Sequence, residues 1–326
     1  VPAAHPGAPP VPEAALVLAS PWYCGVPLVR RAASTAGIEE RSRSARLAAE
    51  AGCDVYHHCG VQPFAPSGAR SVVTVYDTTA LEHPEWHTEQ TVRYSRIEAG
   101  LLRAGAGALA ISKWAADRAA AVIGVPPGRI EVAPGAADDI FTPGEPDAAV
   151  LERLGLAGRG FLLHVGNFVP RKNIPMLIEA FRQACLAGLD LDLVMVGQGG
   201  WKRPEVAGGG VRVFEGLPDG DLLALYRGAA ALLAPSECEG LGLPVLEAMA
   251  CGCGVVASDA AALPETVGRG GILLPPGDAS AWSASMLEIG RGGLAWELRA
   301  MAREAPRRTW VAAASAACEL YRRIAE

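Results

Sequence analysis

The stretch SECEGLGLPVLEAMACGCGVV, residues 236–256, places the carboxylates of Glu239 and Glu247 around a glycine loop and the start of a helix. Seven residues separate Glu239 from Glu247, and Pro244 suits the first turn of a helix, where its missing N–H is not needed. The glycines between the two glutamates let main-chain amides approach a ligand, and a helix N-terminus is a favourable place for a phosphate group. Since carboxylates repel phosphate, we expect these glutamates to bind hydroxyl groups, which sugars and ribose supply.

Short apolar runs recur roughly every 20 to 35 residues along the chain, and helix-like segments separate them. This alternation predicts parallel sheets that are covered by helices on both faces. We expect strands at residues 15–20, 54–58, 71–76, 107–112, 130–134, 161–166, 191–197, 211–216, 231–236, 254–258 and 271–276. The pattern therefore predicts an α/β protein with two doubly wound sheets.

A segment with the composition of an interdomain linker, Phe141–Asp147, separates the two series of strands. It carries two prolines and a glycine. We place an N-terminal Rossmann-like domain at residues 1–143 and a C-terminal one at 144–309. Residues 310–326 have apolar side chains at helical spacing and are expected to form a closing helix. With 326 residues, half of them hydrophobic, the chain can supply two cores.

Charge, hydropathy and cysteine content argue against several classes of protein. The chain has 29 Lys+Arg against 35 Asp+Glu and no dense basic run, so nucleic acid is not an expected partner. No apolar run approaches the roughly 18 to 20 residues of a membrane span, and no secretory signal is visible. The eight cysteines lack the spacing of a zinc site and the density of a disulfide scaffold. We expect a cytoplasmic protein, with peripheral association with the inner membrane left open.

Two adjacent cations, Arg171 and Lys172, follow the expected strand at 161–166. Parallel sheets bind ligands beyond the carboxyl ends of their strands. Taken alone, the two cations could be a solvated surface pair. Beside the glycine loop they would instead hold phosphate oxygens and neutralise charge on a leaving diphosphate.

The motifs of the second half resemble the donor domain of glycosyltransferase family four, whose members are retaining enzymes of the GT-B fold. These motifs are PRKN (170–173), VGQGG (196–200), PSECEGLGLPVLEAMACG (235–252) and LPETVG (263–268). Elements of the first half are similar to the family in the same order: DVYHHCG (54–60), VVTVYDTTALEHPEWH (72–87), ALAISKWAADR (108–118) and IEVAPGAADDIF (130–141). The resemblance implies two Rossmann-like domains facing across a cleft, with the closing helix crossing back to the first.

The resemblance also implies roles for individual residues. Lys172, Glu239 and Arg171 would be catalytic, with Glu239 on the hydroxyls of the donor sugar and the two cations on the diphosphate. Glu247 would accept hydrogen bonds from the ribose. The other donor-binding residues would be Gly166, Asn167, Gly216, Leu217, Gly240, Leu241, Gly242 and Leu243. On the acceptor or sugar side, the matching positions are His57, Tyr76 and Asp77.

These roles imply transfer of a sugar from a nucleoside diphosphate sugar to a glycan, lipid-linked or small-molecule acceptor. No protein nucleophile is evident, so we expect the leaving diphosphate to help deprotonate the acceptor. Neither a cofactor nor a metal ion is expected. The Ala-, Gly- and Arg-rich composition suggests a GC-rich bacterial genome, in which such enzymes build polysaccharides or antibiotics.

Three positions depart from the family pattern. Asn167 stands where an arginine is often found, so Arg171 would share that charge role. The stretch at 18–26 offers only Gly25 as a glycine loop. Tyr76 stands where a histidine commonly bonds the 6-hydroxyl of a hexose. Because tyrosine is longer, we expect a donor altered at that carbon, such as a 6-deoxysugar or a pentose, unless Tyr76 turns into the core.

Several polar patterns favour structural roles. The alternation of Asp190 and Asp192 with leucines favours a strand with polar residues facing outward over a metal-binding acid pair. His83 and His87 lack a completing ligand, and His57–His58 are adjacent on a strand and point apart, so no metal site is expected. For the first histidine of that pair, a functional and a structural role are equally open.

Two other classes of function bear on the same motifs. A nicotinamide dehydrogenase would need Gly-x-Gly-x-x-Gly after an early strand, and VGQGG (196–200) is too short and too late in the chain. A non-catalytic sugar-nucleotide-binding or regulatory protein on the same scaffold stays open, and donor hydrolysis without acceptor would distinguish it. The sequence Cys251–Cys253 favours buried apolar residues over a redox pair.

Overall fold

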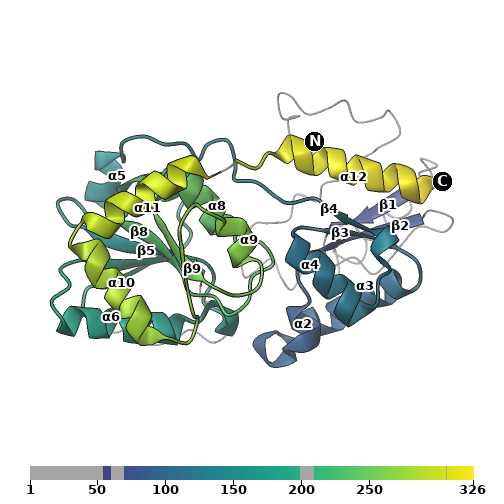
Figure 1. Ribbon diagram of the computed structural model, residues 1–326, viewed down its shortest axis with the longest axis horizontal. Coiled ribbons are helices and arrows are strands. Elements are labelled where there is room, and N and C mark those ends of the chain that lie inside the picture. Colours follow the sequence, from purple (N-terminus) through teal and green to yellow (C-terminus); the bar gives the residue numbers. More distant parts are fainter. Residues whose placement is uncertain (1–53, 60–69, 199–208, 306) are drawn as a thin grey trace. The chain divides into compact units, whose positions relative to one another are not determined.

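The computed structural model describes residues 54–59, 70–198, 209–305 and 307–326 (Figure 1). The strand expected at 15–20 and the glycine loop at 18–26 therefore lie outside the described residues. The chain divides into two compact units. The first extends to Pro134 and includes Trp310–Glu326, and the second is Gly135–Thr309.

The boundary between the units lies ahead of the expected position at 143–144, because the segment after Pro134 is attached to the second unit. Phe141 is buried and packs edge-on against Tyr226, with 5.6 Å between the ring centroids. Arg227 donates hydrogen bonds to the carbonyl (2.9 Å) and the hydroxyl (3.0 Å) of Thr142. Residues with the composition of a linker are thus packed against the second unit.

The first unit contains a parallel sheet with the strand order β1-β2-β3-β4 (Figure 1). Its strands are β1 (Val55–His58), β2 (Arg70–Val75), β3 (Gly107–Ala110) and β4 (Ile130–Val132). Its helices are α2 (Thr79–Glu82), α3 (Glu89–Arg103), α4 (Lys113–Arg118) and α12 (Trp310–Ala325), with short helical turns at Pro84–Trp86, Ala119–Ile123 and Pro127–Arg129. These four strands lie where the apolar runs predict them.

Strand β2 shows how helices cover both faces of the first sheet. Successive residues of a strand point to opposite faces. Val73 and Val75 pack with Leu102 of α3, whereas Val72 packs on the other face with Leu320 of α12. Figure 1 shows α12 on one side of the sheet and α3 and α4 on the other. The C-terminal helix therefore completes the first unit, as predicted.

The second unit contains a parallel sheet with the strand order β10-β9-β8-β5-β6-β7. Its strands are β5 (Phe161–Val165), β6 (Asp192–Val196), β7 (Val211–Phe214), β8 (Ala231–Ala234), β9 (Val255–Ser258) and β10 (Ile272–Leu274). Its helices are α5 (Ala148–Arg153), α6 (Ile174–Leu186), α7 (Asp219–Gly228), α8 (Leu243–Ala250), α9 (Leu263–Val267), α10 (Ala279–Gly290) and α11 (Gly293–Glu304), with a 3₁₀ turn at Pro170–Lys172. All six strands confirm the predicted ones.

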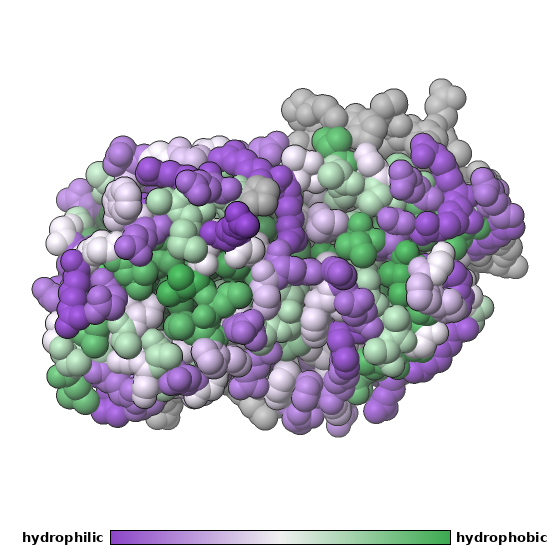
Figure 2. All heavy atoms as spheres, viewed as in Figure 1, coloured by the Kyte–Doolittle hydropathy of each residue, from purple (hydrophilic) through white to green (hydrophobic). Residues whose placement is uncertain are grey.

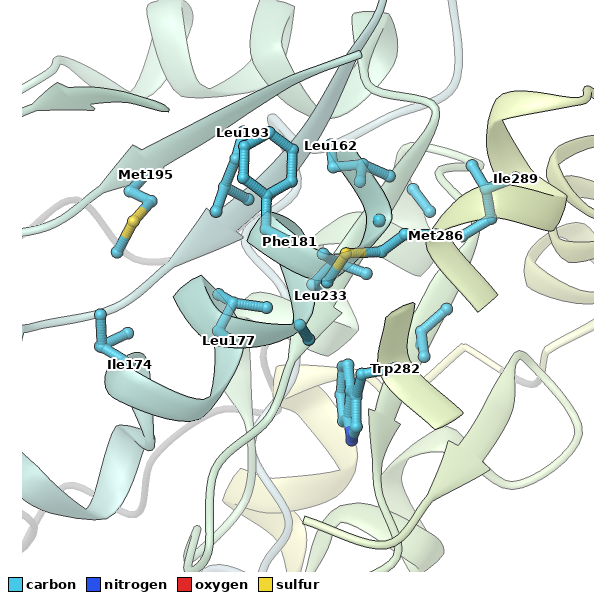
Figure 3. Packing of buried hydrophobic residues seen from close by; sticks show 14 of the residues in the cluster. Leu162, Ile174, Leu177, Phe181, Leu193, Met195, Leu233, Trp282, Met286 and Ile289 are labelled. Atoms are coloured by element: carbon cyan, nitrogen blue, oxygen red, sulfur yellow. The ribbon is translucent and has the colours of Figure 1, made fainter. Parts of the chain in front are cut away.

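A hydrophobic core lies between the second sheet and the helices α6 and α10 (Figure 3). Leu162, Leu193 and Leu233 of the strands pack with Phe181 of α6 and Trp282 of α10. Helix α7 contacts β5, and α8 contacts β8 and β9. The strands are covered on both faces, which explains why they read as continuous apolar runs in the sequence.

The strand order reverses beside β5. From β5 the chain adds β6 and β7 on one side, and it then returns to place β8, β9 and β10 on the other. In open parallel sheets ligands bind at such a reversal, beyond the carboxyl ends of the strands. The loops after β5 and β8 carry the cations and the glutamates of the sequence motifs, so the topology brings these residues together.

The prediction that Asp192 faces outward is wrong. Its carboxylate is buried and accepts hydrogen bonds from Arg159 (2.7 and 3.0 Å) and Arg212 (2.8 Å). Burial by itself raises the pKa of Asp192, but the two guanidinium groups outweigh it and lower the pKa. Strand β6 is an inner strand with both faces covered, so alternation with leucine did not indicate contact with solvent.

The surface seen in Figure 2 is largely hydrophilic, with separate hydrophobic areas between the charged side chains. Within the part of the chain that the structure describes, no helix is both long and apolar enough to cross a bilayer. The same residues contain no group of three or more His, Cys, Asp or Glu side chains that could hold a metal ion. Cys251 and Cys253 are free and buried, as the structural interpretation predicts.

Candidate active site

The loops after β5 and β8 are joined by main-chain and side-chain contacts. The N–H of Glu237 donates to the carbonyl of Arg171 at 2.8 Å. Gly166, which follows β5, leaves room for the side chain of Lys172: a Cβ there would lie 3.0 Å from the Lys172 Cε. Because Gly166 has no side chain, the side chain of Lys172 can pass close to the loop after β5 and reach Glu239 in the loop after β8.

Helix α9 supports the glycine loop from the other side. The Thr266 hydroxyl donates to the carbonyl of Leu241 at 2.6 Å, and the Ala262 N–H donates to the carbonyl of Glu239 at 3.2 Å. Both acceptors belong to the loop that leads into α8. The LPETVG motif at 263–268 thus holds the loop in place from behind.

Glu239 lies among three donors. The Lys172 ammonium is paired with Glu239 Oε1, Ser236 Oγ donates to the same oxygen at 2.8 Å, and Arg171 Nη1 donates to Oε2 at 2.9 Å. Lys172 and Glu239 are each only 8% exposed. Burial by itself raises the pKa of Glu239, but the charges of Lys172 and Arg171 outweigh it and lower the pKa to about 2. Two cations and one carboxylate leave one net positive charge in this buried cluster.

Helix α8 begins beside the cluster. Gly242 precedes the helix with a left-handed backbone (φ 85°), and Pro244 lies in its first turn, as predicted. A side chain at Gly242 would be strained by this φ and would meet Leu263 at 2.8 Å. Among the described residues, the N–H groups of Gly240–Leu243 have no hydrogen-bond acceptor. The start of α8 therefore offers main-chain donors and the positive end of the helix dipole.

Glu247 lies one to two turns further along α8. The hydroxyl of Tyr226, a fully buried residue of α7, donates to Glu247 Oε2 at 2.7 Å. Burial raises the pKa of Glu247, the hydrogen bond from Tyr226 lowers it, and the charges of Asp219 and Asp138 raise it, with a net upward shift. Sequence reasoning predicted Glu247 but missed Tyr226.

A buried histidine lies near the charged cluster on β5. This residue is His164, and its Nδ1–H donates to the carbonyl of Leu233 at 2.9 Å. Burial lowers the pKa of His164 to about 4. Its Nε2 has no hydrogen-bond partner among the described residues. The imidazole is therefore neutral at pH 7 and leaves the positive charge of the cluster to Lys172 and Arg171.

Three other predicted donor residues, Asn167, Gly216 and Leu217, have surroundings of their own. Asn167 is exposed, and its side-chain oxygen accepts a hydrogen bond of 3.4 Å from the N–H of Gln198. Gly216 and Leu217 follow β7, at the edge of the sheet. Within the described residues no hydrogen bond joins these two residues to Glu239 or Lys172. A role in donor binding stays a prediction for all three.

Both ring nitrogens of His57 have partners within the first unit. Its Nδ1 is 2.6 Å from the Tyr321 hydroxyl of α12, and its Nε2 is 2.8 Å from the Thr74 hydroxyl. Burial, with a smaller contribution from His58, lowers the pKa of His57 to about 4. One ring nitrogen contacts the closing helix and the other contacts the neighbouring strand β2, so the geometry favours the structural role over the predicted acceptor-side role.

Tyr76 and Asp77 follow β2 at its carboxyl end. Tyr76 is 50% exposed, and its hydroxyl donates to the carbonyl of Cys59 at 2.9 Å, so this residue does not turn into the core. Asp77 Oδ1 accepts hydrogen bonds from the N–H (2.9 Å) and the hydroxyl (2.6 Å) of Thr79. The Thr79 hydroxyl is also 2.9 Å from His87 Nε2. Both predicted residues lie at a strand end where ligands bind in such sheets.

Several polar residues of the site were not singled out from the sequence: Ser236, Thr266, His164 and Tyr226. Ser236 and Thr266 belong to the quoted motifs, so their positions in ligand-side loops were the available signal. His164 and Tyr226 lie in a strand and a helix whose apolar pattern indicated only core packing. The fold shows what their polar atoms contact: His164 bonds the carbonyl of Leu233, and Tyr226 bonds the carboxylate of Glu247.

Comparison with known proteins places this arrangement in a class. Residues 159–291 match the family described as "Glycosyl transferases group 1". The O-antigen chain mannosyltransferase B of Escherichia coli is 33% identical over 233 residues, which cover 67% of this chain and 61% of that protein. The GDP-mannose-dependent alpha-(1-6)-phosphatidylinositol monomannoside mannosyltransferase of Mycolicibacterium smegmatis is 30% identical over 197 residues, or 55% of this chain and 51% of that protein.

A solved structure shares the fold over most of the chain. The structure of Anabaena Alr3699/HepE in complex with UDP-glucose aligns with a TM-score of 0.66 at 19% identity, covering 87% of this chain and 80% of that one. The second unit therefore belongs to the group 1 glycosyltransferases, and the chain has the GT-B fold of two Rossmann-like units. The predicted family and fold class are confirmed. The chain spans about 61% of the length of the Escherichia coli mannosyltransferase.

Proposed function

We propose that this chain transfers a sugar from a nucleoside diphosphate sugar to an acceptor hydroxyl, with retention of configuration at the anomeric carbon. The observation that supports this most is the buried cluster of Lys172, Arg171 and Glu239 beside the start of α8. The cluster lies at the strand reversal of the second sheet, within the residues that match the group 1 glycosyltransferases.

In this proposal Lys172 and Arg171 bind the diphosphate of the donor. Their charges offset the negative charge that grows on the leaving diphosphate, and the N–H groups of Gly240–Leu243 add further donors. Glu239 exchanges its ion pairs for the hydroxyls of the donor sugar when the diphosphate arrives. Glu247 accepts hydrogen bonds from the ribose.

Glu239 is poorly suited to deprotonate the acceptor, because the neighbouring cations lower its pKa to about 2 before the donor binds and the sugar hydroxyls occupy its carboxylate in the proposed complex. A carboxylate of such low basicity removes a proton from a hydroxyl inefficiently. We therefore assign the deprotonation to the leaving diphosphate, on the face of the sugar from which it departs. Attack from that face retains the anomeric configuration, and the protein contributes positioning and charge stabilisation.

The relatives favour particular substrates within this class. Two are named mannosyltransferases, and the solved structure contains UDP-glucose. We propose a hexose or 6-deoxyhexose as the transferred sugar, with mannose as the first candidate. The names also mention O-antigen chains and phosphatidylinositol mannosides, so a hydroxyl of a glycan or a lipid-linked sugar is the proposed acceptor.

The proposal is tested in two stages. Thermal-shift measurements with UDP, GDP, ADP, dTDP and their common sugar conjugates identify the donor, because a ligand of the native state raises its apparent stability. That donor is then incubated with and without acceptor saccharides, and the released nucleoside diphosphate and the product's anomeric configuration are measured. Release with a retained configuration supports the proposal. Tight binding without release would favour a non-catalytic sugar-nucleotide-binding protein.

A further inference from the structure

We infer that Tyr226 positions Glu247 in the donor site, by holding one of its two carboxylate oxygens so that the other is left to accept hydrogen bonds from the nucleotide. This inference rests on the proposed function, since it takes Glu247 to receive the ribose hydroxyls. It assigns a positioning role to a residue of α7 that belongs to none of the ligand-side loops.

The hydroxyl of Tyr226 is a buried hydrogen-bond donor, and it contacts only one of the two carboxylate oxygens of Glu247. The Tyr226 hydroxyl lies 2.7 Å from Glu247 Oε2, and the tyrosine is 0% exposed. Phe141 packs edge-on against the phenol ring, at a centroid distance of 5.6 Å and an interplanar angle of 83°. A buried tyrosine hydroxyl needs a hydrogen-bond partner. Among the described residues Glu247 Oε1 accepts no hydrogen bond, so one oxygen is committed to the protein and one is not.

The other groups around Glu247 do not support its charge. Asp219 at the start of α7 and Asp138 both repel the carboxylate. The thiols of Cys251 and Cys253, which face Tyr226, are neutral because burial raises the pKa of each to about 12. Burial raises the pKa of Glu247 further.

The nearest guanidinium along α7 is engaged elsewhere, since Arg227 donates its hydrogen bonds to Thr142 and Glu145. The hydrogen bond from Tyr226 is thus the interaction that lowers the pKa of Glu247. It orients the carboxylate and favours its ionised form, and both effects help Glu247 to accept hydrogen bonds from hydroxyl groups.

Tyr226→Phe removes this hydrogen bond and keeps the ring that packs on Phe141. The variant loses a hydrogen bond to a charged group and the orientation that this bond gives the carboxylate of Glu247. We expect the affinity for a nucleoside diphosphate to fall by about five- to tenfold at neutral pH. Nucleotide binding also weakens in acid as Glu247 is protonated, and in Tyr226→Phe this loss moves to higher pH, because the hydrogen bond that lowers the pKa of Glu247 is gone.

The experiment titrates the full chain with UDP, GDP, ADP and dTDP and uses the tightest of the four from about pH 5 to pH 8.5. The variants are Tyr226→Phe, Glu247→Ala and the double variant, with Tyr321→Phe as matched control. The control removes another largely buried tyrosine hydroxyl, one that bonds His57 in the first unit. We expect the control to keep the wild-type Kd and pH profile, and we expect Tyr226→Phe to have no further effect once Glu247 is alanine.

The outcomes separate this inference from the proposed function. A Glu247→Ala variant with wild-type Kd would contradict the proposed nucleotide site, and the inference would fall with it. Weakened binding in Glu247→Ala together with a wild-type Kd and an unshifted pH profile in Tyr226→Phe would overturn the inference alone. Equal losses of affinity from Tyr226→Phe with and without Glu247 would also overturn it, because they would show that the hydroxyl affects binding independently of Glu247.

Discussion

Lys172 and Glu239, 67 residues apart in the sequence, form a buried ion pair where the strand order of the second sheet reverses. Burying two charges is costly, and the attraction between them repays the cost only when further hydrogen bonds complete the site. Ser236 and Arg171 supply these bonds to the carboxylate. The pair therefore holds in place a lysine and a carboxylate that the proposed reaction uses separately.

Glu239→Gln should separate nucleotide binding from sugar transfer. The change removes the carboxylate charge and leaves Lys172 and Arg171 without their anion, so the affinity for a nucleoside diphosphate should stay equal or rise several-fold. Turnover should fall by about a hundredfold or more, since the sugar hydroxyls lose a charged acceptor. Calorimetric titration and initial rates measure the two effects. A large loss of nucleotide affinity with unchanged kcat would contradict the assignment of Glu239 to the sugar.

Activity should survive removal of divalent metal ions. In the proposed site the diphosphate charge is offset by Lys172, Arg171 and the start of α8, which leaves no step that requires a metal. Rates are measured after treatment with EDTA and again after addition of Mg²⁺ or Mn²⁺. Loss of activity with EDTA and its return with either ion would show that the cations of the protein are not sufficient.

Tyr76 should influence the choice of donor sugar. Its hydroxyl is bonded to the Cys59 carbonyl, so it is less available to the 6-hydroxyl of a hexose than an unbonded donor would be. A site that lacks this partner loses little when the hydroxyl is missing. We expect similar kcat/KM for GDP-mannose and its 6-deoxy counterpart GDP-rhamnose, and a shift toward mannose in Tyr76→His. A wild-type preference for mannose of about tenfold or more, unchanged in the variant, would exclude this role.

The free energy of unfolding should fall in mild acid through His57. The pKa of its imidazole is about 4 in the folded chain, against 6.5 for an unperturbed histidine such as that of the unfolded chain. Between these two pH values the unfolded chain binds a proton that the folded chain does not. The contribution of His57 to stability is therefore fully present above pH 6.5 and is lost as the pH falls from 6.5 to 4. The loss amounts to about 3 kcal/mol for one such histidine.

His57→Gln provides the test of that pH dependence. Glutamine does not titrate. The slope of unfolding free energy against pH, which measures the protons taken up on unfolding, should therefore decrease by the equivalent of up to one proton between pH 4 and 6.5. Buried His164, whose pKa is also lowered to about 4, keeps its share of the slope. Denaturant unfolding at a series of pH values measures the change. An identical slope in wild type and variant would show that His57 is not held neutral by the fold.

The sequence predicted the sheets and the charged cluster because both depend on local patterns. Apolar runs mark the strands, and the motifs around Lys172 and Glu239 follow strands that the topology makes neighbours. The partners of the predicted residues were less accessible. The bond from Tyr226 to Glu247 joins two helices, and the bonds from His57 reach Tyr321 near the other end of the chain. Such pairs depend on how elements pack, which the spacing of residues in one element does not encode.

Asp192 and Phe141 are two residues that local composition predicts to be exposed and that the structure buries. Each lies in a stretch whose composition predicts exposure, an alternating strand and a proline-containing linker. Packing overrode both patterns, because Arg159 and Arg212 neutralise the aspartate and Tyr226 covers the phenylalanine. Local composition indicated flexibility or solvent contact, and tertiary partners decided otherwise.

The central claim, that Lys172 stabilises a departing nucleoside diphosphate, is tested most directly by the rate of donor cleavage in Lys172→Ala. The matched control is Arg182→Ala, which removes an exposed cation on α6 of the same unit whose salt bridge is to Glu179. Release of nucleoside diphosphate from the identified donor is followed with saturating acceptor. The account predicts a kcat about a hundredfold or more below wild type for Lys172→Ala and a wild-type kcat for the control. A Lys172→Ala enzyme that folds and keeps the wild-type kcat would contradict it.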